Sequence, residues 1–229
     1  MSRTFFFDII WVMEISWFGH ASFRLKGKET SVVTDPFKPG AVGLKFPSVE
    51  ADIVTISHGH EDHNYIAGVS GQPFVIEAPG EYEIKGVSVF GVACFHDAQQ
   101  GKTRGPNIAY SIEIDGLRVC HLGDLGHKLT NSQIEELNGI DILLIPIGGT
   151  YTLGPKQAVE VITQLEPKIV IPMHYRIDGL DPRLSNQLSG VDAFLKEMGE
   201  EKTAQPKLSI TKDKLPEERE LFILERKNA

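Results

Sequence analysis

Three histidines and two carboxylates fall within six consecutive positions of the stretch ISHGHEDHN, residues 56–64. His58 and His60 are two residues apart, and in an extended chain such residues project to the same side, so both imidazoles can reach one cation. Asp62 and His63 follow after the chain has turned and can face a neighbouring position. Imidazole and carboxylate ligands without a thiolate suit zinc, manganese or iron. The stretch predicts metal binding; the alternative is a polar turn that caps a short helix.

Apolar runs that end in a polar side chain recur along the chain, and four of them end in a His or an Asp. We expect these runs to form strands over residues 53–56, 87–92, 117–122 and 168–172. The side chains at their ends are His58, His96, Asp124 and His174. Because loops at one edge of a sheet sandwich can converge, the sequence predicts that these side chains share one site.

Two further strands are expected near the start, over residues 14–25 and 31–34, joined by the turn KGKE. The second strand ends at Asp35. This carboxylate is our candidate for accepting an imidazole N–H and so fixing the tautomer of a metal ligand. The alternative is a turn-forming Asp-Pro pair. Farther along, Asp115-Gly116 predicts a tight two-residue hairpin turn.

Three helices are expected in the second half of the chain. Thr130 and Gln133 form a capping box that predicts a helix to about residue 137. A second helix is expected over residues 155–165, with Pro in its first turn, and a third over about 184–198, where Leu, Val and Met recur at helical spacing. Strands followed by interleaved helices and strands indicate the layers helix, sheet, sheet, helix.

The composition excludes several classes of protein. Apolar residues make up 41% of the 229 residues and charged residues 24%, which is ordinary for a folded chain and fits one domain over residues 1–229. A net charge of −8 argues against nucleic acid or an anionic membrane as partner. Two cysteines form no disulfide framework and favour a cytoplasmic location. Residues 1–12 lack the features of a signal peptide, and we interpret them as an extension or a misplaced start.

The whole pattern resembles a known family. The motif H-G-H-E-D-H matches the H-x-H-x-D-H signature of the metallo-β-lactamase superfamily, and the later order of His96, Asp124 in HLGD and His174 in PMHY is also similar. The resemblance runs from about Gly19 to Tyr175. The stretches GHASF, TDPF, PIGGTYTLGP and IPMHY resemble the compact branch that includes ascorbate-phosphate lactonases and uncharacterised zinc-dependent hydrolases.

The resemblance implies an α/β fold, a four-layer αββα sandwich of two mixed β-sheets flanked by helices. It also implies two divalent metal ions at one edge, expected to be zinc, with manganese or iron as alternatives. On this mapping one ion is held by His58, His60 and His96. The other ion is held by Asp62, His63 and His174, and Asp124 bridges the two.

The resemblance further implies a hydrolase in which a metal-bridged hydroxide attacks a small-molecule ester, lactone or phosphoester. Asp62 would then be both a metal ligand and the group that orients the hydroxide. The substrate is expected to be a small molecule, and an anionic substrate is one of the alternatives. The alternative is a redox or metal-binding protein with one iron on the same scaffold. A nuclease is less favoured because the chain has no basic arm.

Three histidines and a cysteine lie outside the implied ligand set. His127 follows the Asp124 loop and is our candidate for a proton donor or a hydrogen-bond partner of the substrate; the alternative is no contact with substrate. His20 ends a strand, so it lies either near the site or in the core. His121 is in mid-strand and is expected to be structural. Cys94 is expected to be a buried thiol rather than a ligand.

Two loops could meet a substrate. The loop GGTYTLGP, residues 148–155, lies between a strand and a helix, so its backbone amides and Tyr151 could approach an anion. The loop GKTRGPN, residues 101–107, could be a mobile lid whose Lys102 or Arg104 meets a phosphate. The alternatives are a simple connection for the first loop and a solvated loop for the second.

Overall fold

The computed structural model describes residues 12–227, and a six-stranded sheet forms one half of the sandwich. Its strand order is β14-β1-β2-β3-β5-β7. The bounds are β1 (Met13–Gly19), β2 (Ser22–Lys26), β3 (Ser31–Thr34), β5 (Ile53–Thr55), β7 (Phe74–Ile76) and β14 (Leu208–Ile210). Strands β1, β2 and β3 are antiparallel neighbours, whereas β3, β5 and β7 run parallel. Residues 1–11, most of the expected extension, lie outside the described residues.

A seven-stranded sheet forms the other half, in the order β15-β13-β12-β11-β10-β9-β8. The bounds are β8 (Gly80–Ile84), β9 (Val87–Phe95), β10 (Pro106–Ile114), β11 (Leu117–His121), β12 (Ile142–Pro146), β13 (Ile169–Met173) and β15 (Glu220–Leu221). Strands β8 to β11 are antiparallel, and β11, β12, β13 and β15 are parallel. The hairpin turn is confirmed, because Asp115 and Gly116 both have positive φ, 51° and 77°.

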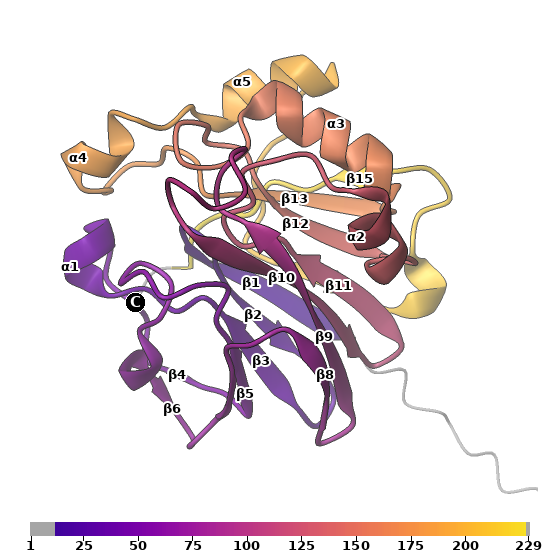
Figure 1. The fold of residues 1–229 in the computed structure, drawn as a ribbon. Helices are drawn as coiled ribbons and strands as arrows, with labels where there is room; N and C mark the ends of the chain where they lie inside the picture. Colours follow the sequence, from indigo (N-terminus) through magenta and orange to yellow (C-terminus); the bar gives the residue numbers. More distant parts are fainter. Residues whose placement is uncertain (1–11, 228–229) are drawn as a thin grey trace, which may run out of the picture.

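Helices cover the seven-stranded sheet on its outer face (Figure 1). These helices are α2 (Asn131–Glu136), α3 (Pro155–Leu165) and α5 (Val191–Met198). Both sides of the Thr130–Gln133 capping box are present, as predicted. The 3-10 helix η2 (Lys212–Lys214) is a further short element. The short helix α4 (Pro182–Ser185) lies apart from these helices, and its Leu184 packs with Phe18 and Val33 of the six-stranded sheet. Among residues 12–227, no helix is long and apolar enough to cross a bilayer.

Shorter elements cover the outer face of the six-stranded sheet, the face away from the seven-stranded sheet. They are α1 (Pro39–Val42), the 3-10 helix η1 (Ile66–Gly68) and a two-stranded sheet of β4 (Val49–Glu50) and β6 (Val69–Ser70). Phe18, Val33 and Val54 of the sheet pack against Phe37 and Leu44 of this layer, and all five are buried. The expected four-layer α/β sandwich is confirmed, with one outer layer built from helices and the other mostly from turns and short strands.

The space between the sheets holds a large apolar core with a few polar links. Trp17 of the six-stranded sheet stacks on Phe23 and on Tyr175, with ring centroids 6.3 and 5.1 Å apart. Tyr110 of β10 donates its hydroxyl hydrogen to the carbonyl oxygens of Ile56 and Ile76, at 2.8 and 3.1 Å. These bonds fix the end of β5 against the opposite sheet, directly before the His-rich stretch.

Two sequence predictions of element bounds are wrong. The strand expected over 14–25 is two strands, because Gly19 and His20 both have positive φ (109° and 53°) and reverse the chain. The helix expected over 184–198 is two helices, α4 and α5. Gly190 breaks it with an extended conformation, φ −81° and ψ 169°, and serves as the N-cap of α5.

Candidate metal centre

Strands from both sheets end at one edge of the sandwich and deliver the predicted side chains there. His58 follows β5 in the six-stranded sheet. His96, Asp124 and His174 follow β9, β11 and β13 in the seven-stranded sheet. Backbone hydrogen bonds join the ends, for example from the N–H of Ile108 to the carbonyl of Ser57 at 2.9 Å. The structure therefore brings together the side chains that the sequence placed at four separate strand ends.

Asp124 lies at the centre of this edge. Its Oδ2 atom is 3.3 Å from Nε2 of His63, 3.1 Å from Nε2 of His96 and 3.2 Å from Nε2 of His174. The N–H of Asp124 donates to Oδ1 of Asn107 at 2.9 Å, which fixes the backbone of the loop. Three imidazoles from three loops thus surround one buried carboxylate.

The first of two ligand clusters on this edge consists of His58, His60 and His96. Their ligand atoms all lie within 4.8 Å of one another. Nε2 of His58 is 3.0 Å from Nδ1 of His60, so two ring nitrogens point at the same space. His58 and His96 are buried, whereas His60 is exposed. This cluster is thus closed on the protein side and open to solvent at His60.

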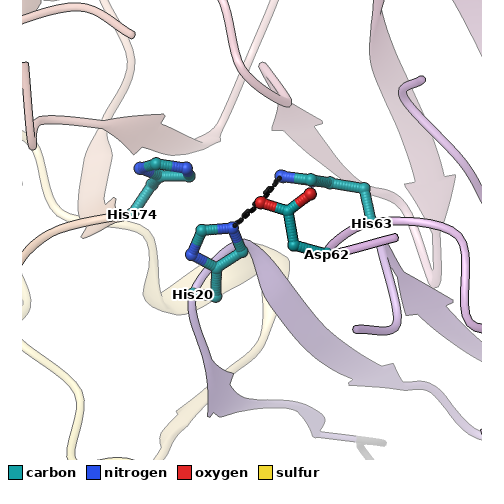
Figure 2. A group of neighbouring side chains, drawn as sticks. All are labelled: His20, Asp62, His63 and His174. Atoms are coloured by element: carbon teal, nitrogen blue, oxygen red, sulfur yellow. Dashed lines mark hydrogen bonds and ion pairs between the residues drawn. The ribbon is translucent and has the colours of Figure 1, made fainter. Parts of the chain in front are cut away.

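The second cluster consists of His20, Asp62, His63 and His174, whose ligand atoms also lie within 4.8 Å of one another (Figure 2). Nε2 of His20 is 3.2 Å from Oδ2 of Asp62 and 3.2 Å from Nε2 of His63. Asp62, His63 and His174 match the set implied for the second ion. His20 is an additional member, and its sequence signal was its place at a strand end, directly after a glycine.

Contacts from both sheets hold the turn that carries His20. The carbonyl oxygen of His20 accepts hydrogen bonds from Nε1–H of Trp17 and from the N–H of His174, both at 3.0 Å. Nε2 of His121 bonds the carbonyl of Ala21 at 2.7 Å, so its ring carries the hydrogen there. His20 and His174 both have positive φ, 53° and 52°. These bonds offset the cost of that backbone conformation.

Asp35 supports the second cluster from behind. Its Oδ2 lies 2.8 Å from Nδ1 of His63 and accepts a hydrogen bond from the hydroxyl of Ser57 at 2.5 Å. Its Oδ1 accepts from the N–H of Ser57 at 2.7 Å. Because Nδ1 of His63 donates to this buried carboxylate, Nε2 is directed at Asp124. Asp35 thus sets the ring orientation of a candidate ligand, the arrangement typical of carboxylate–histidine–metal sites.

Burial favours the neutral, metal-binding form of two of these histidines, His58 and His20. Burial, with the neighbouring His63, lowers the pKa of His58 to about 3. Burial, with His174 nearby, lowers the pKa of His20 to about 4. Burial also lowers the pKa of His63, but the carboxylates of Asp124 and Asp62 outweigh it and hold that pKa well above its usual value. A metal ion at the second cluster must therefore displace a proton from His63.

The residues present fit two divalent cations. Oδ1 of Asp124 is buried without a hydrogen-bond partner among the described residues, which costs free energy unless a cation balances it. Oxygen and imidazole ligands without thiolate suit zinc, manganese or iron. His58, His60 and His96 would hold one ion. Asp62, His63 and His174, with His20 adjacent, would hold the other, and Asp124 would be shared.

Two other residues singled out from the sequence, His127 and Cys94, lie outside both clusters. Nε2 of His127 accepts the N–H of Phe95 at 3.1 Å, and its Nδ1 lies 2.7 Å from the carbonyl of Lys128, to which it donates. Both ring nitrogens of His127 are thus bonded to the backbone. Cys94 is buried and bonded to Nδ2 of Asn107, and burial raises the pKa of its thiol to about 11. It is a core thiol.

Replacing Asp35 with Asn should weaken metal binding without removing a ligand. The asparagine side chain has only one oxygen, so it cannot accept the hydrogen bonds that Asp35 accepts at Oδ1 and at Oδ2. The ring of His63 then loses its fixed orientation. We expect the zinc affinity of the second cluster to fall about 10- to 100-fold. Competition with a chromophoric chelator measures this affinity.

The matched control for this variant is Asp52→Asn. Asp52 also accepts the N–H of a serine, Ser31, but it lies at the opposite end of β5 and pairs with Lys85. Its replacement should leave zinc affinity unchanged. Wild-type affinity in Asp35→Asn would contradict the supporting role of Asp35.

Comparison with known proteins agrees with this geometry. The β-lactamase superfamily domain model matches residues 14–174. A metal-dependent hydrolase from Thermococcus onnurineus is 32% identical over 193 residues, which cover 72% of this chain and 85% of that protein. One from Pelotomaculum thermopropionicum is also 32% identical over 193 residues, covering 71% and 84%.

A solved structure is more similar still in sequence. It is a protein from Thermotoga maritima described as a candidate Zn-dependent hydrolase of the metallo-β-lactamase superfamily. The two chains are 41% identical, with a TM-score of 0.75, and the match covers 93% of this chain and 98% of that one. The fold, the ordered ligand set and these relatives lead to one conclusion: the chain belongs to the metallo-β-lactamase superfamily.

Proposed function

We propose that this metal-dependent hydrolase cleaves an ester, lactone or phosphoester bond of a small molecule and uses two divalent ions, zinc in the first place. The observation that carries the proposal is the position of Asp124, whose Oδ2 contacts histidines of both ligand clusters within 3.3 Å. A shared carboxylate between two clusters is the arrangement expected of a dinuclear site. The names of the relatives, metal-dependent hydrolases, support the reaction class.

When bound, the two ions would lower the pKa of a water and polarise the substrate oxygen. The chain contributes the orientation of the reacting groups. Asp62 is the candidate for orienting the water, because 27% of its side chain is exposed, against 3% for Asp124 and 0% for Asp35. His20 contacts Oδ2 of Asp62 and so restricts the rotation of that carboxylate.

A substrate panel tests this proposal. The purified protein, loaded with zinc or manganese, is assayed against lactones, carboxylic esters, phosphomonoesters and phosphodiesters. We expect turnover of at least one of these classes and loss of turnover after dialysis against a chelator. Hydrolysis of none of them by metal-loaded protein would defeat the proposal.

The iron-based alternative is tested by the metal itself. Two ligand clusters that share Asp124 favour two ions over a single iron, so we expect elemental analysis to find two ions per chain. A single iron per chain with dioxygen consumption and no hydrolysis would favour the redox alternative. The net charge of −8 supports a small molecule rather than a nucleic acid as substrate. Cleavage of RNA or DNA would contradict that part.

A further inference from the structure

A cavity of about 430 Å³ opens beside the first ligand cluster. His58 and His60 form part of its wall, so a molecule in this cavity lies next to the candidate metal centre. Ile56, Pro106 and Ile108 give other parts of the wall an apolar surface. Arg104 supplies the only guanidinium among its lining residues. A small molecule with an apolar body fits such walls, and the guanidinium favours a molecule that also carries an anionic group.

The guanidinium of Arg104 forms no ion pair among residues 12–227. Its guanidinium lies over the ring of Tyr151, 5.3 Å from the centroid, and no carboxylate of the described chain forms an ion pair with it. Glu77 lines the same cavity but is exposed to water. Stacking on an aromatic face leaves the N–H groups at the edge of a guanidinium free to bind an anion in a bidentate manner. The cavity therefore presents one guanidinium that is held in no ion pair, next to the candidate metal ligands.

The loop that carries Arg104 is fixed from within by Asp97. Oδ1 of Asp97 accepts the N–H groups of Gln99 and Gly101, at 2.7 and 3.0 Å, and its Oδ2 accepts those of Thr103 and Arg104, at 3.0 and 2.8 Å. Asp97 directly follows the candidate ligand His96. The loop is thus a pre-organised turn rather than the mobile lid that its composition allowed, and it sets Arg104 relative to the metal centre.

We infer that the substrate of this hydrolase carries an anionic group, a carboxylate or a phosphate, apart from the bond that is cleaved, and that Arg104 binds this group. The inference rests on the proposed function and adds the substrate class. The net charge of −8 disfavours the approach of anions to the protein as a whole. A guanidinium without an ion pair in the cavity attracts an anion locally. The stacked, loop-fixed side chain loses little conformational freedom on binding.

The test uses binding of simple probes by the zinc-loaded protein. Linear monocarboxylates and α,ω-dicarboxylates of four to eight carbons are compared by titration calorimetry. One carboxylate can bind at the metal centre and the second can reach Arg104. We expect at least one dicarboxylate to bind about tenfold more tightly than the monocarboxylate of the same length, the gain typical of a charge-assisted hydrogen bond. Phosphonates of matched length show whether phosphate or carboxylate is preferred.

Variants assign the gain to Arg104. Arg104→Gln should abolish the preference for the dianion, and Arg104→Lys should keep part of it. Lys102→Gln removes a charge from an exposed position of the same loop and should retain the full preference. Circular dichroism and zinc content confirm that each variant is folded and loaded.

Two results would overturn the inference: no dianion binds more tightly than its monoanion, or Arg104→Gln and Lys102→Gln reduce the preference equally. The readout does not involve catalysis. Absence of turnover in the substrate panel would therefore defeat the proposed hydrolysis without changing the outcome of this binding test.

Discussion

Replacing Asp124 with Asn is expected to reduce the metal content from two ions per chain to one or fewer and to lower hydrolysis by about 10³-fold or more. The carboxylate is buried, and its Oδ2 lies 3.1 to 3.3 Å from three histidines that belong to both clusters. An amide of the same shape removes the negative charge that two cations would share. Loss of such a charge at the reacting centre has effects of this size. Elemental analysis and the initial rate on the best panel substrate measure both quantities.

Asp141→Asn is the matched control. Asp141 is a buried aspartate like Asp124. Its carboxylate accepts the backbone N–H of Arg118 and pairs with Lys212. It directly precedes β12, at the end of the sheet away from the metal centre. This variant should keep two ions and wild-type hydrolysis. Retention of both ions and full activity in Asp124→Asn would show that Asp124 is not the shared ligand.

Removal of metal is expected to lower the melting temperature, Tm, by about 10 °C. A ligand present at about 1,000 times its Kd stabilises the folded state by about 4 kcal/mol, and 1 kcal/mol corresponds to roughly 2–4 °C for a chain of this size. The physical reason is local. The ligands come from both sheets, so the ions would cross-link the two halves of the sandwich and balance the buried charge of Asp124.

Differential scanning calorimetry before and after chelation measures this shift. Adding two equivalents of zinc to the metal-free protein should restore Tm, and magnesium, which prefers all-oxygen sites, should not. An unchanged Tm after complete removal of metal would mean that the ligand clusters do not link the sheets energetically.

The candidate ligands could be singled out from the sequence because they follow simple local patterns. His58, His60, Asp62 and His63 lie within six consecutive positions, and His96, Asp124 and His174 each follow an apolar run that forms a strand as expected. Alternation of apolar residues is a property of neighbouring positions, so it can be read from the sequence without knowing the fold. The layers of the sandwich followed from the same patterns.

His20 could not be assigned from the sequence because its position depends on contacts between distant segments. The turn at Gly19-His20 has positive φ at a non-glycine residue, which is uncommon even for histidine, so the local sequence alone does not predict it. It is held by His174 and His121, which lie more than 100 positions away in the chain. The same turn explains why one expected strand is two.

The loops around the cavity show the same limit. The sequence left open whether residues 101–107 are a lid or a solvated loop. Asp97 decides the question by accepting four backbone N–H groups of its own loop. An aspartate after a histidine gives no such signal in the sequence. His127 similarly had the right place for a proton donor, but both of its ring nitrogens are bonded to backbone.

The most direct test of the dinuclear hydrolase is a metal titration with activity as the readout. Metal-free protein receives zinc in steps, and hydrolysis of the best panel substrate is measured after each step. The two clusters that share Asp124 predict that activity rises until two equivalents of zinc per chain are bound and then stays constant. A plateau at one equivalent, or hydrolysis that does not depend on metal, would contradict the dinuclear site.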